Sequence, residues 1–222
     1  TYYVNVVVMD VAGNKAAYTM NNAYTPKQQR LFWADNYSER IYRVNLDGSN
    51  RQIEESNLVT PWGIALDIDT RKIYWTDRGP GAQWIRQSDI NGSNGSQVTI
   101  VDGLNSPYGI EIDAENNNIY WVDYSNRAIY MVSSIDTGQS LPAPLLSLTG
   151  DPYDLALDLD GNKIYWTERN YSGGLDRIGV ADIDYTDPPA TLTASTFIDN
   201  SVTANLLYLP TAIEYDSGND MV

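Results

Sequence analysis

Short runs of apolar and aromatic residues recur along the chain, each bounded by polar, turn-forming residues. One of them, "KIYWTD" at Lys72–Asp77, places Ile73, Tyr74 and Trp75 side by side and closes them with an acid. Successive side chains of a strand point to opposite faces, so large apolar groups in sequence predict a strand buried on both faces. The longest candidate apolar run, Val4–Met9, has strand length and falls far short of the roughly 20 residues that span a bilayer. The pattern therefore predicts an all-β chain and no direct membrane insertion.

This run occurs four times at a regular spacing. Its copies are "LFWAD" (Leu31–Asp35), "KIYWTD", "IYWVD" (Ile119–Asp123) and "IYWTE" (Ile164–Glu168). The tryptophans of the copies, Trp33, Trp75, Trp121 and Trp166, lie 42, 46 and 45 residues apart. Periods of this length are typical of β-propeller blades.

A second element precedes the run by a fixed distance. "PWGIALDID" begins at Pro61, "PYGIEIDAE" at Pro107 and "PYDLALDLD" at Pro152, and each proline stands 14 residues before the tryptophan that follows. The constant offset predicts that the two elements form one hairpin. Asp, Gly and Asn between them are turn residues.

Two more strands complete each repeat. Apolar and polar residues alternate in Arg40–Ser49, Trp84–Ser93 and Ala128–Gly138, and a short strand such as Gln97–Val101 follows. Each repeat is then a four-stranded antiparallel meander, whose two apolar faces must be covered by neighbouring repeats. Pro210–Val222 repeats the proline element, so the chain holds about four and a half repeats.

These repeats resemble the YWTD repeat, also called the low-density lipoprotein receptor class B repeat, over Leu31–Val222. The resemblance implies a six-bladed β-propeller outside cells, incomplete here, with the missing blades downstream or supplied by another chain. A WD40 propeller has a similar period but carries a Gly-His dipeptide, and this chain has no histidine. Glu168 replaces the family's closing Asp, and Ala34 and Val122 replace its Thr.

The first residues carry a different pattern. Thr1–Met20 contains two alternating strands around a turn, and it resembles the last hairpin of a fibronectin type III or similar immunoglobulin-like sandwich. We therefore predict a β-sandwich remnant at residues 1–25, a linker at 26–30 and propeller blades at 31–222, truncated in the fifth repeat. The alternative is that Thr1–Met20 forms an outer propeller strand.

The amino-acid composition excludes several kinds of bond and functional site. Cysteine and histidine are both absent, which excludes disulfides, Cys/His zinc sites, thiol nucleophiles and a Ser-His-Asp triad. The net charge of −15 argues against a nucleic-acid partner. Asp158, Asp160 and Asn162 are spaced like part of a calcium loop, but the twelve-residue loop and its closing Glu are not evident, so a hairpin turn is favoured. We expect no cofactor and no metal.

The acids that close the repeats are Asp35, Asp77, Asp123 and Glu168. An active site needs one pair of acids and not one acid per blade, so we interpret these residues and the repeated tryptophans as structural. The resemblance implies that they form hydrogen bonds within and between blades. The alternative function is a lactonase-like propeller hydrolase with a metal in its channel, for which Glu111 and Asp154 are the candidate residues.

A binding surface is the stronger prediction. Because a four-stranded blade runs up and down, the segments after each proline and after each closing acid emerge on one rim. The first group is Trp62, Tyr108 and Tyr153, and the second is Tyr37, Arg78, Tyr124 and Tyr171. Aromatic residues and arginine dominate protein interfaces, and the resemblance implies protein ligands on this rim. The alternative is that some of these rings only cap the blade ends.

Four Asn-x-Ser sequons, at Asn36, Asn91, Asn94 and Asn170, fall in predicted loops. If they carry N-glycans, the chain belongs outside the cell, and sugar at Asn36 and Asn170 would sit on the rim. We predict a non-enzymatic extracellular module of a larger secreted or cell-surface protein. It would bind other proteins, or copies of itself in an adhesive or filament-forming structure.

Overall fold

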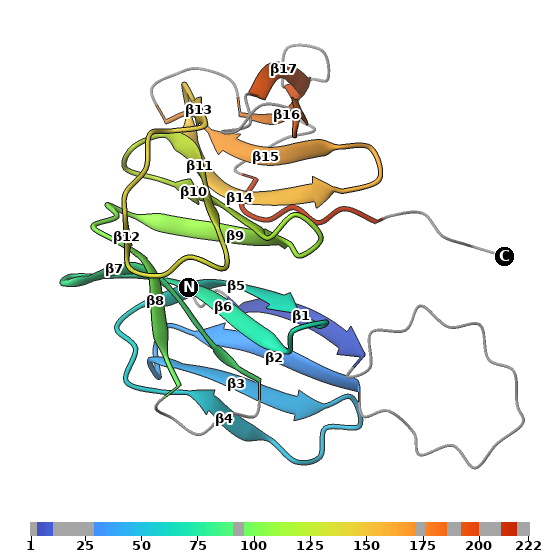
Figure 1. The fold of residues 1–222 in the computed structure, drawn as a ribbon. Helices are drawn as coiled ribbons and strands as arrows, with labels where there is room; N and C mark the ends of the chain where they lie inside the picture. Colours follow the sequence, from blue (N-terminus) through green and yellow to red (C-terminus); the bar gives the residue numbers. More distant parts are fainter. Residues whose placement is uncertain are drawn as a thin grey trace, which may run out of the picture.

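The structure, a computed structural model, describes residues 4–10, 29–90, 96–171, 176–185, 192–199 and 210–216. Within these ranges the regular elements are strands, and they form four sheets stacked one after another (Figure 1). The predicted all-β fold is confirmed. The second strand and the turn of the hairpin predicted in residues 1–25 lie outside the described residues.

Each sheet takes its strands almost entirely in chain order. The first sheet is β1 (Val4–Asp10), β2 (Gln29–Asp35), β3 (Arg40–Asn45) and β4 (Gln52–Glu55). The second is β5 (Pro61–Asp67), β6 (Lys72–Gly79), β7 (Ala82–Asp89) and β8 (Val98–Asp102). The third is β9 (Pro107–Asp113), β10 (Asn118–Asp123), β11 (Ala128–Ser133) and β13 (Leu146–Ser147). The fourth is β14 (Asp151–Asp158), β15 (Lys163–Arg169), β16 (Arg177–Ile183) and β17 (Leu192–Asp199).

The hairpins predicted from the constant offset are present with one shared register. The proline of each first strand lies opposite the closing acid of the second strand: Pro61 with Asp77, Pro107 with Asp123 and Pro152 with Glu168. Each tryptophan lies opposite an aliphatic residue of the first strand, and each hairpin has an irregularity just after the proline. The repeat in the sequence is therefore a repeat in hydrogen-bond geometry.

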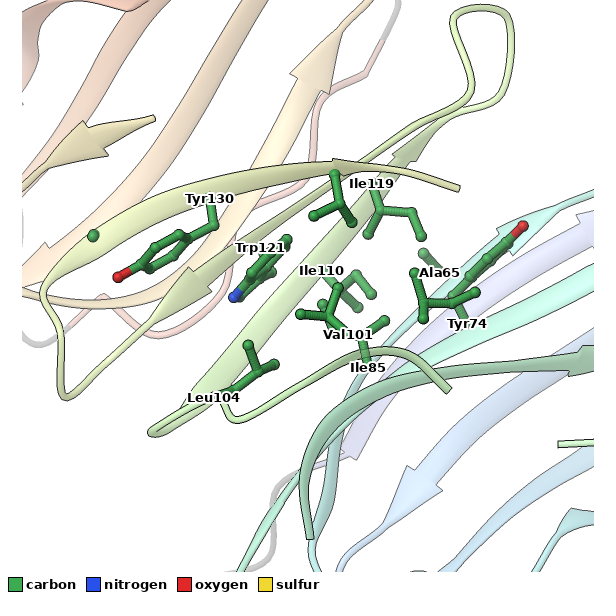
Figure 2. Packing of buried hydrophobic residues seen from close by; sticks show 12 residues of the cluster. Ala65, Tyr74, Ile85, Val101, Leu104, Ile110, Ile119, Trp121 and Tyr130 are labelled. Carbon is green, nitrogen blue, oxygen red and sulfur yellow. The ribbon is translucent and has the colours of Figure 1, made fainter. Parts of the chain in front are cut away.

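Consecutive sheets pack face to face through the repeated tryptophans. Trp75 packs with Phe32 and Ile41 of the first sheet, and Trp166 packs with Tyr120 and Ile129 of the third. Figure 2 shows the contact between the second and third sheets, where Trp121 lies among residues of both. Trp75, Trp121 and Trp166 are fully buried, so each closes the contact with the sheet before it.

Trp33 of the first sheet occupies the same position in its repeat, but it is only half-buried. It stacks on Tyr42, with ring centroids 5.3 Å apart, and the Arg51 guanidinium lies 4.6 Å from the centroid of the Tyr42 ring. Trp121 and Tyr130 stack in the same way within the third sheet, at 5.3 Å. Stacking of the tryptophan on a tyrosine is thus shared by the first and third repeats, whereas Trp75 and Trp166 lie opposite Arg86 and Gly179.

The first strands of consecutive sheets lie side by side on the inside of the array: β1 contacts β5, β5 contacts β9, and β9 contacts β14. The approach is close at Gly63, where an added Cβ would stand 2.6 Å from the Tyr108 carbonyl oxygen. The Thr76 hydroxyl fixes this approach, because it accepts from the Gly63 N–H at 2.9 Å and donates to the Tyr108 carbonyl at 2.7 Å. Pro210–Asp216, the fifth proline element, contacts β14 in turn through the Ile213 N–H, which donates to Asp154.

Two features depart from the expected meander. β1 pairs antiparallel with β2 along its whole length and takes the first-strand position of the first sheet. The separate sandwich remnant predicted for residues 1–25, and its boundary, stay a prediction, since residues 11–28 lie outside the described ranges. The other departure is β12 (Gln139–Ser140), which leaves the third repeat and pairs in parallel with β8, covering the edge of the second sheet.

Candidate binding rim

Six of the predicted rim residues come together because the start of each first strand pairs with the end of the second. Trp62, Tyr108 and Tyr153 are the residues after the prolines of β5, β9 and β14. Arg78 and Tyr124 directly follow the closing acids of β6 and β10. The antiparallel pairing of proline with acid brings both groups to one edge of the stacked sheets.

The rings form one continuous cluster across the second, third and fourth sheets. Tyr108 lies at its centre, with ring centroids 4.9 Å from Trp62, 5.1 Å from Tyr124 and 5.3 Å from Tyr153. Tyr124 and Tyr153 meet edge to face at 5.5 Å. The Tyr153 and Tyr171 hydroxyls are within hydrogen-bond distance, at 3.1 Å. We call these five rings the aromatic rim.

Two arginines lie against the aromatic rim. The Arg78 guanidinium is 4.1 Å from the Trp62 ring centroid and 4.4 Å from that of Tyr108, and it donates to the Tyr108 hydroxyl at 2.7 Å. Arg169 lies 4.0 Å from the Tyr153 centroid and donates to the Tyr171 hydroxyl at 2.9 Å. Sequence analysis selected Arg78 and missed Arg169, although Arg169 also directly follows a closing acid. Its position directly after Glu168 is the feature of the sequence that identifies it.

The exposed fractions of the side chains distinguish the buried ring of the aromatic rim from those that reach the surface. Tyr108 is only 8% exposed and lies at the junction of its neighbours. Trp62, Tyr124 and Tyr153 are half-buried, and Tyr171 is 58% exposed. Tyr37, on the turn after β2, is 80% exposed. Burial raises the pKa of Tyr153 further above its ordinary value, so the ring is a neutral phenol well beyond physiological pH.

The closing acids hold the segments that connect one sheet to the next. Asp77 is buried and accepts from the N–H groups of Val59 and Thr60, at 2.9 and 2.7 Å. Asp123 accepts in the same way from two N–H groups of the segment before β9, at 3.1 and 3.0 Å. Asp35 differs, because its carboxylate accepts from the N–H groups of Tyr37 and Ser38 in its own turn.

In the fourth repeat, the closing acid is Glu168 instead of an aspartate. Glu168 accepts from the Gly150 N–H at 2.7 Å and pairs with Arg177 at 2.7 Å. Its extra methylene also brings Oε1 to 2.8 Å from the Trp166 indole nitrogen, which donates to it. The indole N–H groups of Trp75 and Trp121, which are followed by aspartates, have no acceptor within the described part of the chain.

A second group of acids lies where the first strands meet. Burial raises the pKa of Asp154 to about 7, and burial together with Glu214 and Asp154 raises the pKa of Glu111 well above its ordinary value. Burial also raises the pKa of Glu214. Within the ranges described, no three His, Cys, Asp or Glu side chains are placed to hold a metal ion.

The remaining candidates occupy turns. Asp158 accepts from the Gly161 N–H at 2.8 Å in the turn between β14 and β15, and Asp67 and Asp113 accept from turn N–H groups in the matching hairpins. This is the hairpin turn favoured over a calcium loop. Asn36 and Asn170 are half-buried and directly precede Tyr37 and Tyr171, whereas Asn91 and Asn94 lie outside the described residues.

Four stacked antiparallel sheets whose first strands lie together define an incomplete β-propeller. Residues 29–68 match the family model "Low-density lipoprotein receptor repeat class B", and the YWTD-type motif recurs around Trp75, Trp121 and Trp166. No helix in the described ranges is long and apolar enough to cross a membrane.

Two Drosophila proteins resemble part of this chain in sequence. Protein cueball of Drosophila ananassae is 31% identical over 86 residues, which are 36% of this chain and 13% of that protein. Vitellogenin receptor Yl of Drosophila melanogaster is 35% identical over 85 residues, 37% of this chain and 4% of the receptor. The chain thus matches only a small part of each relative's length.

Solved structures share the fold over a larger part of the chain. A chain of the nidogen/laminin complex covers 84% of this chain, and 64% of its own length, with a TM-score of 0.65 and 23% identity. The gluconolactonase XC5397 of Xanthomonas campestris covers 64% of this chain and 51% of its own, with a TM-score of 0.52 and 16% identity. At these identities the likeness shows the fold alone.

Proposed function

We propose that this chain is a non-enzymatic, extracellular protein-binding module, and that it binds its partners through the aromatic rim. The observation that carries the proposal is the continuous cluster of five rings and two arginines across three sheets. Half-buried aromatic rings give a large contact area at low entropic cost, and arginine adds hydrogen bonds at the same surface. A sequence likeness to a vitellogenin receptor over 85 residues and a fold shared with a chain of a nidogen/laminin complex support this role.

The partner is another protein or a second copy of the chain. In either case the partner covers Trp62, Tyr153 and Tyr171, since these rings reach the surface while Tyr108 supports them from below. An extracellular location, secreted or at the cell surface, is part of the same proposal and accords with the sequons at Asn36 and Asn170.

A matched pair of variants tests the proposal. Trp62→Ala, Tyr153→Ala and Tyr171→Ala together remove the exposed part of the aromatic rim and leave Tyr108 in place. Phe197→Ala removes a ring of similar size that is 58% exposed on β17, away from the rim cluster. Immobilised chain is offered the extracellular fraction of its source, and self-association is followed by sedimentation velocity.

We expect the triple variant to lose at least about tenfold in affinity, as truncation of interface anchors does, while Phe197→Ala matches the parent chain. Equal binding or self-association by the triple variant and the parent chain would refute the rim as the binding surface. Circular dichroism of each variant verifies that the sheets are intact.

The alternative, a propeller hydrolase with a channel metal, rests on Glu111 and Asp154, whose pKa values are raised by burial and by the nearby Glu214 where the first strands meet. Elemental analysis of the purified chain distinguishes the two functions. We expect no stoichiometric metal; one divalent ion per chain that disappears in Glu111→Gln would favour the hydrolase.

A further inference from the structure

A small polar cavity opens beside the aromatic rim, between the third and fourth sheets. Its volume is about 110 Å³, and its lining includes Arg127, Thr149, Asp151, Arg169 and Tyr171. Tyr171 belongs to both sites, because it lines the cavity and its hydroxyl lies 3.1 Å from that of Tyr153. A partner laid across the rings would therefore pass the mouth of this cavity.

The charge of the cavity is opposite in sign to that of the chain. Two guanidinium groups and one carboxylate give its lining a charge of +1, whereas the whole chain carries −15. The Arg127 Nε pairs with Asp151 at 2.7 Å, and 52% of the Arg127 side chain remains exposed. Opposite charge confined to one concave site attracts an anionic group.

Arg169 strengthens this attraction because its partners are neutral. It is buried, it donates to the Tyr171 hydroxyl and to the Pro210 carbonyl at 3.1 Å, and it lies over the Tyr153 ring. Among the described residues, no carboxylate lies within ion-pair distance of Arg169. A buried cation without an anion is costly, and a bound carboxylate would remove that cost.

We propose that this cavity takes a carboxylate of the partner protein, an Asp or Glu side chain whose neighbours lie on the aromatic rim. The proposal deepens the proposed function and rests on it. The planar guanidinium groups of Arg127 and Arg169 match a carboxylate in shape and charge. The Thr149 hydroxyl, which accepts from Arg177 at 3.0 Å, retains its own proton to donate. Asp151 is then an internal competitor for Arg127.

A test with small probes needs no natural partner. The arginine Nε–Hε signals of the labelled chain are followed by NMR at pH 7 during titration with the capped tripeptide acetyl-Ala-Asp-Ala-amide, and with acetyl-Ala-Asn-Ala-amide as the isosteric neutral control. We expect the Asp peptide to shift the Arg127 and Arg169 signals saturably and to bind at least about fivefold more tightly than the Asn peptide. Equal shifts from both peptides, or shifts that are equal at Arg51, would overturn the proposal.

Three variants sharpen the result. Asp151→Asn removes the competitor and should tighten binding of the Asp peptide, and Arg127→Gln should reduce its preference over the Asn peptide, because only Arg169 then remains. Arg51→Gln, at a cation on the first sheet, should change neither. No gain in Asp151→Asn together with no loss in Arg127→Gln would refute the site, even if the ring variants still lose the natural partner, so this failure is separable from that of the proposed function.

The source of the carboxylate is tested in the same experiment. Sialyllactose supplies a carboxylate on a sugar, and lactose is its neutral match. Saturable shifts from sialyllactose without shifts from the Asp peptide would assign the cavity to acidic glycans and overturn the protein-partner proposal. Ser172→Ala, which removes the Asn170 sequon without changing Asn170, keeps the chain's own glycan from covering the cavity.

Discussion

Replacing the closing acid of the second repeat tests how the sheets are joined. Asp77 is buried, and its carboxylate accepts from the Val59 and Thr60 N–H groups at 2.9 and 2.7 Å. Asp77→Ala leaves both N–H groups without an acceptor, at about 1–3 kcal/mol each, so we expect a loss of about 2–6 kcal/mol in the free energy of unfolding. Asp77→Asn keeps one acceptor oxygen and should lose about half as much.

The matched control is the same residue of the motif in the first repeat. Asp35 accepts from N–H groups of its own turn and is only half-buried, so water can replace its carboxylate. Asp35→Ala should therefore lose only about 0.5–1 kcal/mol. Urea unfolding followed by tryptophan fluorescence measures both variants. If Asp35→Ala loses as much as Asp77→Ala, the closing acid does not act by holding the segment between sheets.

Two further predictions concern the first strands. Gly63→Ala would place a Cβ 2.6 Å from the Tyr108 carbonyl oxygen. We therefore expect a loss of about 1–3 kcal/mol in the free energy of unfolding. An unchanged urea midpoint would show that the strands do not approach so closely. The pKa of Asp154 is raised to about 7 from an ordinary value of 3.8, so the folded state binds its proton more tightly and this group lowers stability as pH rises from about 4 to 7. Asp154→Asn should remove about 4 kcal/mol of that decline, since each pKa unit corresponds to about 1.4 kcal/mol, and parallel pH profiles for parent and variant would contradict it.

The repeat made much of the fold predictable. The offset of 14 residues between proline and tryptophan predicted three hairpins, and Pro61, Pro107 and Pro152 each lie opposite the closing acid. That inference worked because hairpin pairing is local and the turn residues determine its register. The same reasoning could not predict that β12 pairs in parallel with β8. These two strands belong to different repeats, and the segment around β12 has no periodic pattern of apolar residues.

The sequence predicted which residues lie on the rim, but not how their side chains pack against one another. Antiparallel pairing was enough to place Trp62, Tyr108 and Tyr153 on one edge. Which ring lies buried depends on packing between sheets, so the central place of Tyr108 could not be seen in the sequence. Likewise, the cavity beside Arg127 arises where two sheets meet, and no stretch of sequence contains it.

The most direct test of protein binding by the aromatic rim is a binding isotherm by surface plasmon resonance for the captured partner, or for the chain itself if it self-associates. The parent chain, the Trp62/Tyr153/Tyr171 triple alanine variant and Phe197→Ala are compared side by side. Our account predicts an affinity at least about tenfold weaker for the triple variant alone. Indistinguishable isotherms for all three chains would contradict it.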